Sequence, residues 1–512
     1  MLDLVQYPKV VICMLFVLHL VLRRAWQRRR RPNLPLPPGP KGYPIIGNLF
    51  DIPTEYPERA YSRLLDRYGG LMAGFNAVGR DMVYLESFGT GILVLGSLKR
   101  TTDLFEKRSS IHSDRPVSPV LSLMEFDKFF SLMRYGTRWR RQRKLFHEYF
   151  NPIVIPQYRP LILEERINYI RDLANNPCAF WERTRTYFTR IILRSTYSIE
   201  PTGNDDPFVK NPELVGEGFN VAGKTGTFIV DFMPALKYVP DWIPGTGWKK
   251  FVRYYNDAGE KARVLAFEQV REKLRCPLIQ SLPNEDDPKF EEEVLCARDT
   301  AAVAYIGGAD TSSGVALATL CLLAIHPDIQ KRAQAEIDQV VGLGRLPDFD
   351  DRDQLVYLGA ILKEVARLYQ IAPLGVAHAA LEDDVYDGCF IPKGTIILGN
   401  SWHILHDPNI YPDPFSFNPD RFIKDGMLRK DILNPFSAAF GFGRRICPGR
   451  YFSHDTIFAM ISSVLACFDL SPRKDDNGRQ VPLKFELEEG VLIHPKRFQC
   501  EFTPRMPSRP YD

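Results

Sequence analysis

Hydrophobic and polar positions alternate with the period of an α-helix along most of the chain. Apolar residues recur every three or four positions in segments separated by short polar breaks, as in helices that bury one face. These segments span residues 58–68, 137–149, 161–175, 291–325, 327–341, 354–369 and 451–467. The pattern predicts that helices make up most of the fold.

Strand-like patterns are few and short. They span residues 82–86, 92–95, 385–391 and 395–398. Residues 382–394, EDDVYDGCFIPKG, predict a hairpin in a small sheet. No regular alternation of strands and helices is present, which disfavours a dinucleotide-binding βαβ fold. We therefore expect a mainly α protein with small β-sheets.

The N-terminal region differs in composition from the rest. Residues 10–22, VVICMLFVLHLVL, form an apolar run shorter than the ~20 residues that span a bilayer as a helix. Arginines at positions 23, 24, 28, 29, 30 and 31 follow, so the positive-inside rule places them and the remaining chain in the cytosol. We expect a membrane anchor over 1–31, a stiff Pro-rich linker over 32–53 and a catalytic domain over 54–512. A tail that only lies on the bilayer is the alternative for the first segment.

Charge and cysteine content exclude several classes of protein. The formal net charge is only +4, and the positive charge gathers near the N-terminus, which gives no support for nucleic-acid binding. The nine cysteines are scattered and form no C-x-x-C pair. This spacing argues against a disulfide framework, a zinc site and an iron–sulfur cluster. It suits a catalytic body in the reducing cytosol.

One cysteine has neighbours that suit a metal ligand. Residues 440–449, FGFGRRICPG, hold Cys447 among glycines and arginines. Gly443 lets the backbone turn tightly, Gly449 allows close approach to a flat cofactor, and Arg445 offers a fixed cation for a carboxylate. The N-terminus of a following helix would place partial positive charge near the sulfur. We interpret this loop as a thiolate ligand site, with a buried inert thiol as the alternative.

A second cluster lies within the long apolar segment 291–325. Residues 307–312, GGADTS, place two adjacent glycines in mid-helix, where each costs about 1 kcal/mol relative to alanine. A local bulge or kink there, with the Asp310 carboxylate and the Thr311 hydroxyl, would hold a water chain that delivers protons. The alternative is a helix-packing glycine pair with a threonine bonded to its own backbone.

Together these motifs resemble the cytochrome P450 family. Its haem-binding signature, F-x-x-G-x-R-x-C-x-G, is matched by Phe440, Gly443, Arg445, Cys447 and Gly449. Residues 307–312 are similar to its oxygen-activation motif. The resemblance covers nearly the whole chain. It implies haem b with the Cys447 thiolate as axial ligand and O2 as co-substrate.

The resemblance also implies roles for other residues. Thr311 would deliver protons, with Asp310 as relay. The motifs E-x-x-R and P-x-R-F, which form a buried ion-pair core in the family, are matched by Glu364, Arg367 and Arg421. The residues that would contact the haem propionates are Trp139, Arg143 and His378. Gln370 and Ala377 depart from the family pattern, because many relatives have proline at these positions.

Substrate specificity is expected in segments 116–134, 219–248, 372–376 and 490–493. The residues expected in the pocket are Val303, Ile306, Ala309, Ala372, Leu374, Val376, Val491 and Leu492. Segment 219–248 is rich in aromatic and apolar residues and would dip into the membrane or pack as a loop. Several basic residues could form a positively charged face that binds an acidic flavoprotein, or they could only be a run of solvated charges. These residues are Arg138, Arg140, Arg141, Lys144 and Arg444.

The function implied by the resemblance is insertion of one oxygen atom of O2 into a lipophilic small molecule, as in fungal microsomal enzymes of secondary metabolism. Electrons would come from NADPH through a cytochrome P450 reductase, with cytochrome b5 as a further partner. We expect a monomer on the endoplasmic reticulum membrane that faces the cytosol and binds no nucleic acid. The alternatives are a haem-thiolate isomerase or dehydratase, which Thr311 disfavours, and a non-catalytic membrane-anchored haem protein.

Overall fold

The computed structural model describes residues 32–44, 46–68, 81–201, 203, 206–224, 227–271 and 286–505. The expected membrane anchor, 1–31, lies outside these residues. The chain divides into two compact units. Unit 1 comprises Met1–Pro116, Leu374–Ile404 and Gly441–Arg445. Unit 2 comprises Val117–Pro373, Leu405–Phe440 and Ile446–Asp512.

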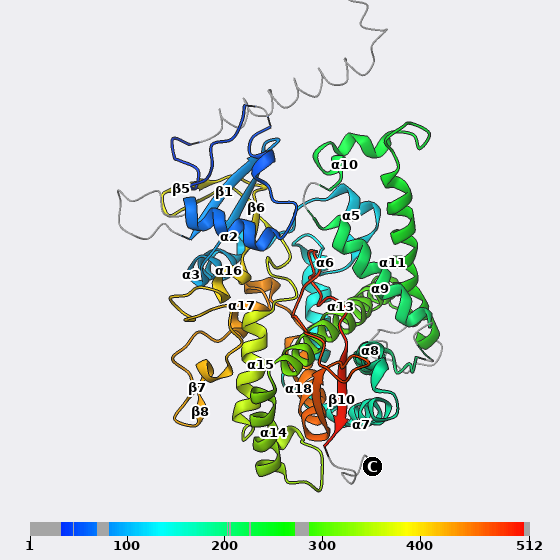
Figure 1. Ribbon diagram of the computed structural model, residues 1–512. Helices are drawn as coiled ribbons and strands as arrows, with labels where there is room; N and C mark the ends of the chain where they lie inside the picture. The colour runs from blue at the N-terminus through cyan, green and yellow to red at the C-terminus, as the bar shows by residue number, and fades with distance from the viewer. Residues whose placement is uncertain are drawn as a thin grey trace, which may run out of the picture. The chain divides into compact units, whose positions relative to one another are not determined.

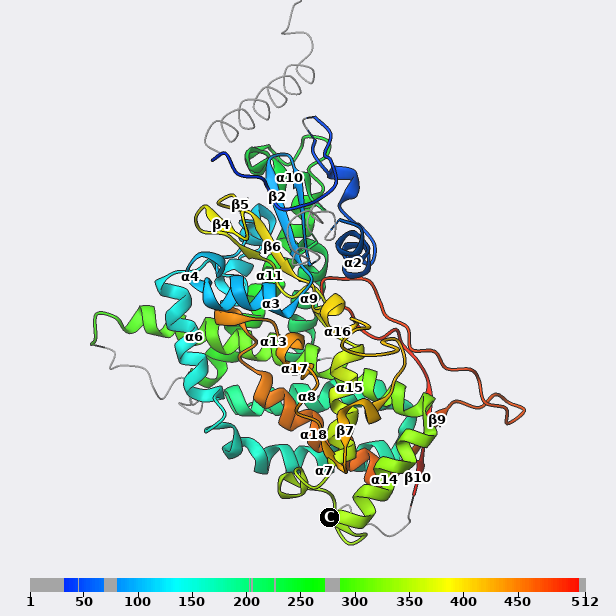
Figure 2. The ribbon, with the colours of Figure 1, turned by 90° about the vertical axis from the view of Figure 1, so that its left-hand side faces the viewer.

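Unit 1 is built on a four-stranded sheet of order β1-β2-β6-β3. Figure 2 shows its neighbouring strands β2 and β6. Its strands are β1 (Met82–Ser87), β2 (Thr90–Leu95), β3 (His378–Ala379) and β6 (Ile396–Gly399). β2 pairs antiparallel with β1 and parallel with β6. Phe88 and Gly89 have φ values of 48° and 75°, as a two-residue hairpin turn with right-handed twist requires.

The sheet of unit 1 buries one face under helix α2 (Pro57–Tyr68). Tyr61 and Leu65 of α2 pack on Val83, Ile92 and Val94 of the sheet. Further elements of this unit are η2 (Leu49–Asp51), α3 (Leu98–Thr101), the π-helix η3 (Thr102–Lys107), α4 (Ser109–His112), β4 (Asp384–Tyr386), β5 (Cys389–Ile391), α16 (Ser401–Leu405) and η10 (Gly443–Arg445). β4 and β5 form the hairpin predicted within 382–394.

Unit 2 is mainly helical, and its long helix α13 (Phe290–Ile325) packs against α6, α8, α9, α11 and α18 (Figure 1). Its other helices are α5 (Pro119–Leu123), α6 (Thr137–Phe150), α7 (Arg159–Asn175), α8 (Phe180–Tyr197), α9 (Pro207–Ala222), α10 (Ile229–Phe232), α11 (Trp248–Arg271), α14 (Pro327–Val341), α15 (Val356–Leu368), α17 (Phe436–Ala439) and α18 (Arg450–Cys467). The 3-10 turns are η4 (Phe126–Lys128), η5 (Ile155–Tyr158), η6 (Pro177–Ala179), η7 (Pro234–Tyr238), η8 (Phe349–Asp351) and η9 (Pro419–Phe422). Its two-stranded sheets are β7 (Ile423–Lys424) with β8 (Met427–Leu428), and β9 (Phe468–Pro472) with β10 (Cys500–Pro504).

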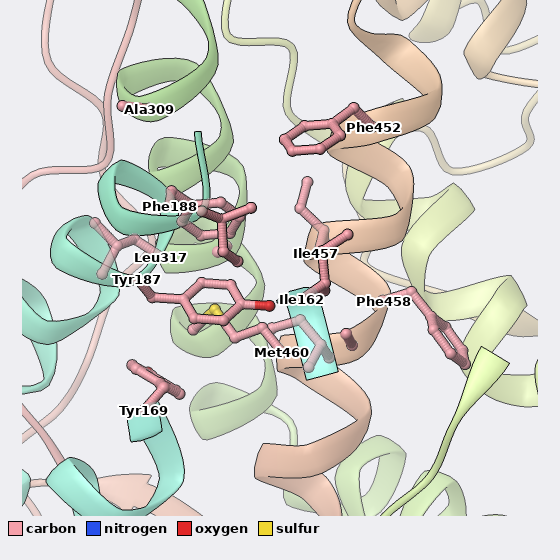
Figure 3. Packing of buried hydrophobic residues seen from close by; sticks show 14 of the residues in the cluster. Ile162, Tyr169, Tyr187, Phe188, Ala309, Leu317, Phe452, Ile457, Phe458 and Met460 are labelled. Carbon is pink, nitrogen blue, oxygen red and sulfur yellow. The ribbon is translucent and has the colours of Figure 1, made fainter. Parts of the chain in front are cut away.

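The core of unit 2 lies between α8, α13 and α18. Tyr187 and Phe188 of α8 meet Leu317 of α13 and Ile457 and Met460 of α18 (Figure 3). α18 is buried on all sides after its first turn, as expected for a helix that is apolar all round. Burial of each such side chain contributes roughly 1.5–3 kcal/mol, so this cluster fixes α13 and the N-terminus of α18 in unit 2.

The predicted fold class is confirmed: the described chain is mainly helical with small sheets. The seven predicted helices are present, and their ends differ from the prediction by at most two residues. Among the described residues, α13 is the helix long and apolar enough to cross a membrane, but most of its apolar window is buried inside the protein. This burial is typical of a core helix.

Candidate active site

Cys447 lies in the loop just before α18. Its sulfur accepts hydrogen bonds from the backbone N–H groups of Gly449 and Arg450, at the start of that helix. The Cys447 N–H donates to the Phe440 carbonyl at 2.8 Å, which closes the loop. Burial raises the pKa of the Cys447 thiol, whereas the backbone N–H groups of Gly449 and Arg450 and the charge of Arg143 act in the opposite direction. The loop therefore supplies the donors that a thiolate needs, and a bound metal cation would remove the proton.

Arg143 and Trp139 lie one turn apart on α6. Arg143 Nη2 donates to the Ile446 carbonyl at 2.6 Å, next to the cysteine. Burial lowers the pKa of Arg143 to about 10, and the Cys447 thiol opposes this shift. Trp139 is buried and stacks at an angle on Tyr135, with ring centroids 5.0 Å apart. α6 thus holds a guanidinium against the cysteine loop.

His378, Arg445 and Arg115 form a buried cationic cluster in unit 1. His378 Nδ1 lies 2.8 Å from the His112 carbonyl, and Arg445 Nε donates to the Ser113 carbonyl at 2.8 Å. Burial, together with repulsion from Arg115 and Arg445, lowers the pKa of His378 well below its usual value. Burial and repulsion from Arg445 also lower the pKa of Arg115. The carboxylates of a bound ligand would relieve the repulsion between these basic side chains.

Arg115 is a functional candidate that sequence reasoning missed. Its Nη1 donates to the carbonyls of Val376 and Ala377 at 2.6 and 2.8 Å. These bonds fix the segment in which Ala377 departs from the family pattern. The sequence around Arg115, HSDRP, gives no sign of this role, because the carbonyls it binds lie far along the chain.

Haem is the cofactor that these residues fit. Taken by itself, unit 1 contains buried arginines of the kind that bind carboxylates such as haem propionates. Taken by itself, unit 2 contains a thiol that faces backbone N–H donors. A Cβ placed at Gly449 or at Gly307 of α13 would meet nothing within 4 Å, so both backbones border open space. Because glycine has no side chain, a planar macrocycle can approach the backbone closely at such positions.

The backbone of the cysteine loop requires glycine at position 443. Gly443 has a φ of 56°, and a Cβ there would lie 1.9 Å from the Phe105 carbonyl oxygen. The Phe105 ring in turn contacts His378 and Phe442. The loop is therefore pressed against the π-helix η3 within unit 1.

The expected bulge at Gly307 and Gly308 is wrong, because α13 runs as a continuous α-helix. Gly308 instead serves helix packing: a Cβ there would lie 3.2 Å from Ile192 of α8. Thr311 Oγ1 donates to the Gly307 carbonyl at 2.6 Å, so its hydroxyl is satisfied by its own helix. This is the alternative arrangement that the sequence allows for the motif.

Asp310 does not pair with Thr311. Its carboxylate lies 3.2 Å from Nε2 of His494, a residue that sequence reasoning missed. Asp310 and Ala309 both line a cavity on the α8 and α9 side of α13. Ala309 is also buried in the core of unit 2, which does not support its expected place in the substrate pocket.

The other residues expected in the pocket lie in different surroundings. Val303 and Ile306 pack against two of the apolar clusters of unit 2, and Leu374 packs against the sheet of unit 1. The Leu492 N–H and carbonyl bond to the Asn220 side chain of α9 at 2.7 and 2.9 Å. The residues that are half-buried are Ala372, Val376 and Val491.

Glu364, Arg367 and Arg421 form a buried cluster in unit 2. Glu364 accepts from Arg367 Nε at 2.7 Å and from Arg421 Nε at 3.1 Å. Gln370, the other departure from the family pattern, donates from Nε2 to the Ala366 carbonyl at 2.9 Å. Its side chain thus satisfies a carbonyl at the C-terminus of α15, which a proline would leave unpaired.

Two of the basic residues expected to form a face for a partner, Arg138 and Arg141 of α6, pair with acidic neighbours. Arg138 pairs with Asp299 at 2.9 Å, and Arg141 pairs with Glu293 at 2.8 Å. These pairs reduce the positive charge that α6 offers a partner.

Comparison with known proteins finds a family model and several relatives that match most of the chain. The cytochrome P450 family model matches residues 37–502. The chain is 37% identical over 513 residues to cytochrome P450 monooxygenase COX1 of Coprinopsis cinerea, with 97% of each chain covered. It is 38% identical to the cytochrome P450 monooxygenase eriA of Hericium erinaceus, with 95% of this chain and 92% of the relative covered.

A third relative, tryptamine 4-monooxygenase of Psilocybe cyanescens, is 33% identical, with 93% of this chain and 94% of the relative covered. The family model and these identities span the cysteine loop, α13 and the buried ion-pair cluster. The chain therefore belongs to the cytochrome P450 family and is a haem-thiolate monooxygenase.

Proposed function

We propose that Cys447 is the axial ligand of haem b and that the enzyme inserts one oxygen atom of O2 into a lipophilic small molecule. The observation that carries this proposal is the environment of the Cys447 sulfur, which combines the N–H groups of Gly449 and Arg450 with the nearby charge of Arg143. Such donors stabilise a thiolate in a buried site. When bound, the haem supplies the oxygen-activating chemistry.

The remaining site residues have distinct tasks in this proposal. Thr311 holds and passes a proton at Oγ1, and Asp310 supplies protons to it. Glu364, Arg367 and Arg421 keep the polypeptide around α15 rigid. The residues proposed to bind or border the haem propionates are Trp139, Arg143, His378, Arg445 and Arg115, and those proposed to shape the loop are Phe440, Gly443 and Gly449. The burial of Trp139, His378, Arg445 and Arg115 and the positive charge of the three arginines support the proposed contacts with the propionates.

The substrate class is proposed from the relatives. They are fungal monooxygenases, and one is named for tryptamine. We propose a small lipophilic intermediate of secondary metabolism, with the sequence-predicted segments 219–248 and 490–493 as its contacts. Trp242 and Tyr238 in the first segment are 81% and 78% exposed, which suits contact with a membrane.

The cellular setting is also a proposal. Residues 1–31 would anchor the catalytic domain 54–512 to the cytosolic face of the endoplasmic reticulum, with 32–53 as linker. An NADPH–cytochrome P450 reductase would supply electrons, with cytochrome b5 as a further donor. The apolar run and the six arginines that follow it support this orientation.

The test is the carbon-monoxide difference spectrum of the reduced full chain in membranes. The wild-type protein and a Cys178→Ser control, in which an exposed cysteine is replaced, should give the Soret band of a haem thiolate. Cys447→Ser should lose that band even where haem is retained. A thiolate band in Cys447→Ser would refute the assignment.

A turnover assay separates the classes of function. With reductase, NADPH and a panel of terpenoids, indoles and fatty acids, a monooxygenase forms a product that carries one atom from ¹⁸O2. An isomerase or dehydratase would act on a peroxide without NADPH, and a haem carrier would turn over none of these compounds.

A further inference from the structure

Asp310 and His494 form an ion pair on the side of α13 that faces α8 and α9. Asp310 Oδ2 lies 3.2 Å from His494 Nε2, and the two side chains are 20% and 22% exposed. Burial opposes ionisation of both groups, yet their mutual hydrogen bond and attraction raise the pKa of His494 and lower that of Asp310. Both shifts favour the charged form of the pair.

The C-terminal segment holds His494 rigidly against α13. Its carbonyl accepts from the Glu488 N–H at 2.7 Å, and the preceding residue, Ile493, donates to the Ile371 carbonyl at 2.8 Å. The Ile493 carbonyl accepts from Tyr369 Oη at 2.7 Å. A Cβ at Gly314 would lie 3.0 Å from His494 Nδ1, so this glycine lets the imidazole approach the helix. The backbone thus places His494 where it meets Asp310.

The carboxylate of Asp310 also borders a small cavity that is partly open to solvent. Its polar lining comprises Arg185, Thr189, Glu213, Tyr305, Asp310 and Ser313. Arg185 and Glu213 pair at 2.8 Å and are 37% and 40% exposed, so they reach solvent. The cavity therefore extends from the solvent-exposed ion pair of Arg185 and Glu213 to the Asp310 carboxylate of α13.

Tyr305 lines this cavity and has a buried hydroxyl. Tyr305 is 1% exposed, and its Oη has no hydrogen-bond partner within the described part of the chain. A buried hydroxyl without a partner costs about 1–3 kcal/mol, and an ordered water is the usual remedy in a polar cavity. This hydroxyl and the surface ion pair both favour a hydrated passage.

We propose that this cavity is the proton entrance of the enzyme and that His494 is a positioning residue that holds the Asp310 carboxylate at its inner end. The proposal rests on the proposed function of Asp310 as a proton relay. When the pair opens, Asp310 accepts one proton at Oδ2 from a hydronium ion in the cavity, whose O–H bond breaks to leave water. Asp310 then passes this proton toward Thr311 and pairs again with His494. No other bond is made or broken in the protein.

The surrounding charges are consistent with this direction of transfer. The charged or titratable groups that face the pair are Arg185, Glu213, Tyr369 and Glu488. Burial raises the pKa of Glu213, and the charges of Asp310 and Glu217 raise it further against the opposing effect of Arg185. A raised pKa increases the protonated share of Glu213 at the mouth of the cavity, as a proton donor requires.

The first experiment measures His494 directly and needs no turnover. In the full-length, reduced, carbon-monoxide-bound protein with labelled histidine, the His494 resonances are assigned by comparison with His494→Gln and followed against pH. We expect a pKa above 6.5 in the wild type and a lower pKa in Asp310→Asn, because burial then acts alone. If the pKa of His494 is unchanged in Asp310→Asn, the two residues do not form an ion pair and the proposal is overturned.

The second experiment measures proton delivery. In His494→Gln and His494→Phe, product formed per NADPH should fall at least about threefold and the solvent isotope effect on product formation should increase. The substrate-induced spectral shift and the carbon-monoxide spectrum should stay as in the wild type. The matched control is Lys496→Gln, which removes a surface pair with Glu486 two residues further on.

Each result of these experiments decides the proposal. Unchanged coupling and isotope effect in both His494 variants would refute it, even if Cys447 proves to be the haem ligand. If both variants fail to bind haem, the titration of His494 in Asp310→Asn decides whether the proposal stands. Failure of the proposed function would be recognised separately, because Cys447→Ser would then keep the thiolate band.

Discussion

Glu364 and Arg367 form a two-point ion pair one helical turn apart, and neither side chain is exposed to solvent. Glu364 Oε2 and Oε1 accept from Arg367 Nε and Nη2 at 2.7 and 2.8 Å. Arg367 also donates to the carbonyls of Leu405 and Pro414 at 3.2 and 2.7 Å, and Glu364 accepts from the Asn418 N–H at 2.9 Å. The pair therefore fastens α15 to the segment that carries Arg421.

Removal of one partner from this pair should be costly. In Glu364→Ala, two guanidinium groups remain buried without their carboxylate, and we expect the free energy of unfolding to fall by about 3–5 kcal/mol. The matched control is Asp420→Asn, which breaks the exposed pair between Arg332 and Asp420 and should cost at most about 1 kcal/mol. Urea unfolding of both variants measures the difference. Equal losses would show that the buried pair has no special role in stability.

Glycine at position 443 is required by space and by backbone conformation. Gly443→Ala would bring a Cβ to 1.9 Å from the Phe105 carbonyl and would hold alanine at a φ of 56°. We expect the variant to lose more than about 2 kcal/mol of stability and to incorporate less haem. Gly344→Ala is the control, because a Cβ there meets nothing within 4 Å. Thermal unfolding and the ratio of haem to protein test this, and a Gly443→Ala protein as stable as the control would contradict it.

Local signals explain why the helices were predicted well. α14 begins at Pro327, in a position where the missing N–H costs nothing, and it ends before Gly342, which has a φ of 78°. α13 was found by its long apolar run. The bulge at Gly308 was predicted wrongly, because the Ile192 side chain of α8 occupies the space that the glycine leaves. Such tertiary contacts are not visible in local sequence.

The same distinction between local sequence signals and tertiary contacts holds for the candidate active site. Motifs with short spacing brought Cys447 and Arg445 to attention, because the chemistry and the turn are encoded within one loop. Arg115 and His494 were missed, since each acts on residues far away in the sequence. Their partners are backbone carbonyls and a carboxylate that only the fold brings near.

The hydroxyl of Thr311 should control how efficiently electrons are used. Thr311→Val keeps the shape of the side chain but removes the proton held at Oγ1, which lies 2.6 Å from the Gly307 carbonyl. We expect less product per NADPH and more hydrogen peroxide, with at least about a tenfold change in their ratio, because general acid catalysis is lost. Product, NADPH and peroxide are measured together.

Thr319 provides the matched control for this experiment. It lies two turns further along α13 and donates in the same way to the Val315 carbonyl at 2.8 Å. Thr319→Val should leave the ratio of product to peroxide unchanged. If Thr311→Val and Thr319→Val behave alike, the hydroxyl of Thr311 has only a structural role.

Buried histidines should make the protein sensitive to acid. Burial lowers the pKa of His454 to about 4, and its ring contacts Phe436 edge-on with centroids 5.2 Å apart. In the unfolded chain, a histidine has its ordinary pKa of about 6.5. As the pH falls below that value, the unfolded state binds a proton that the folded state does not, so stability is lost progressively between about pH 6.5 and 4.

His454→Gln should remove part of this acid sensitivity. Between pH 7.5 and pH 5, the wild type should lose up to about 2 kcal/mol more stability than the variant, because one proton-binding difference has been abolished. His112 and His378, whose pKa values are also lowered by burial, contribute equally to both proteins and cancel in the comparison. His147→Gln, at an exposed position of α6, is the control and should keep the pH dependence of the wild type. Urea unfolding at the two pH values decides, and identical pH dependence in His454→Gln and the wild type would mean that His454 is protonated in the folded protein as readily as in the unfolded chain.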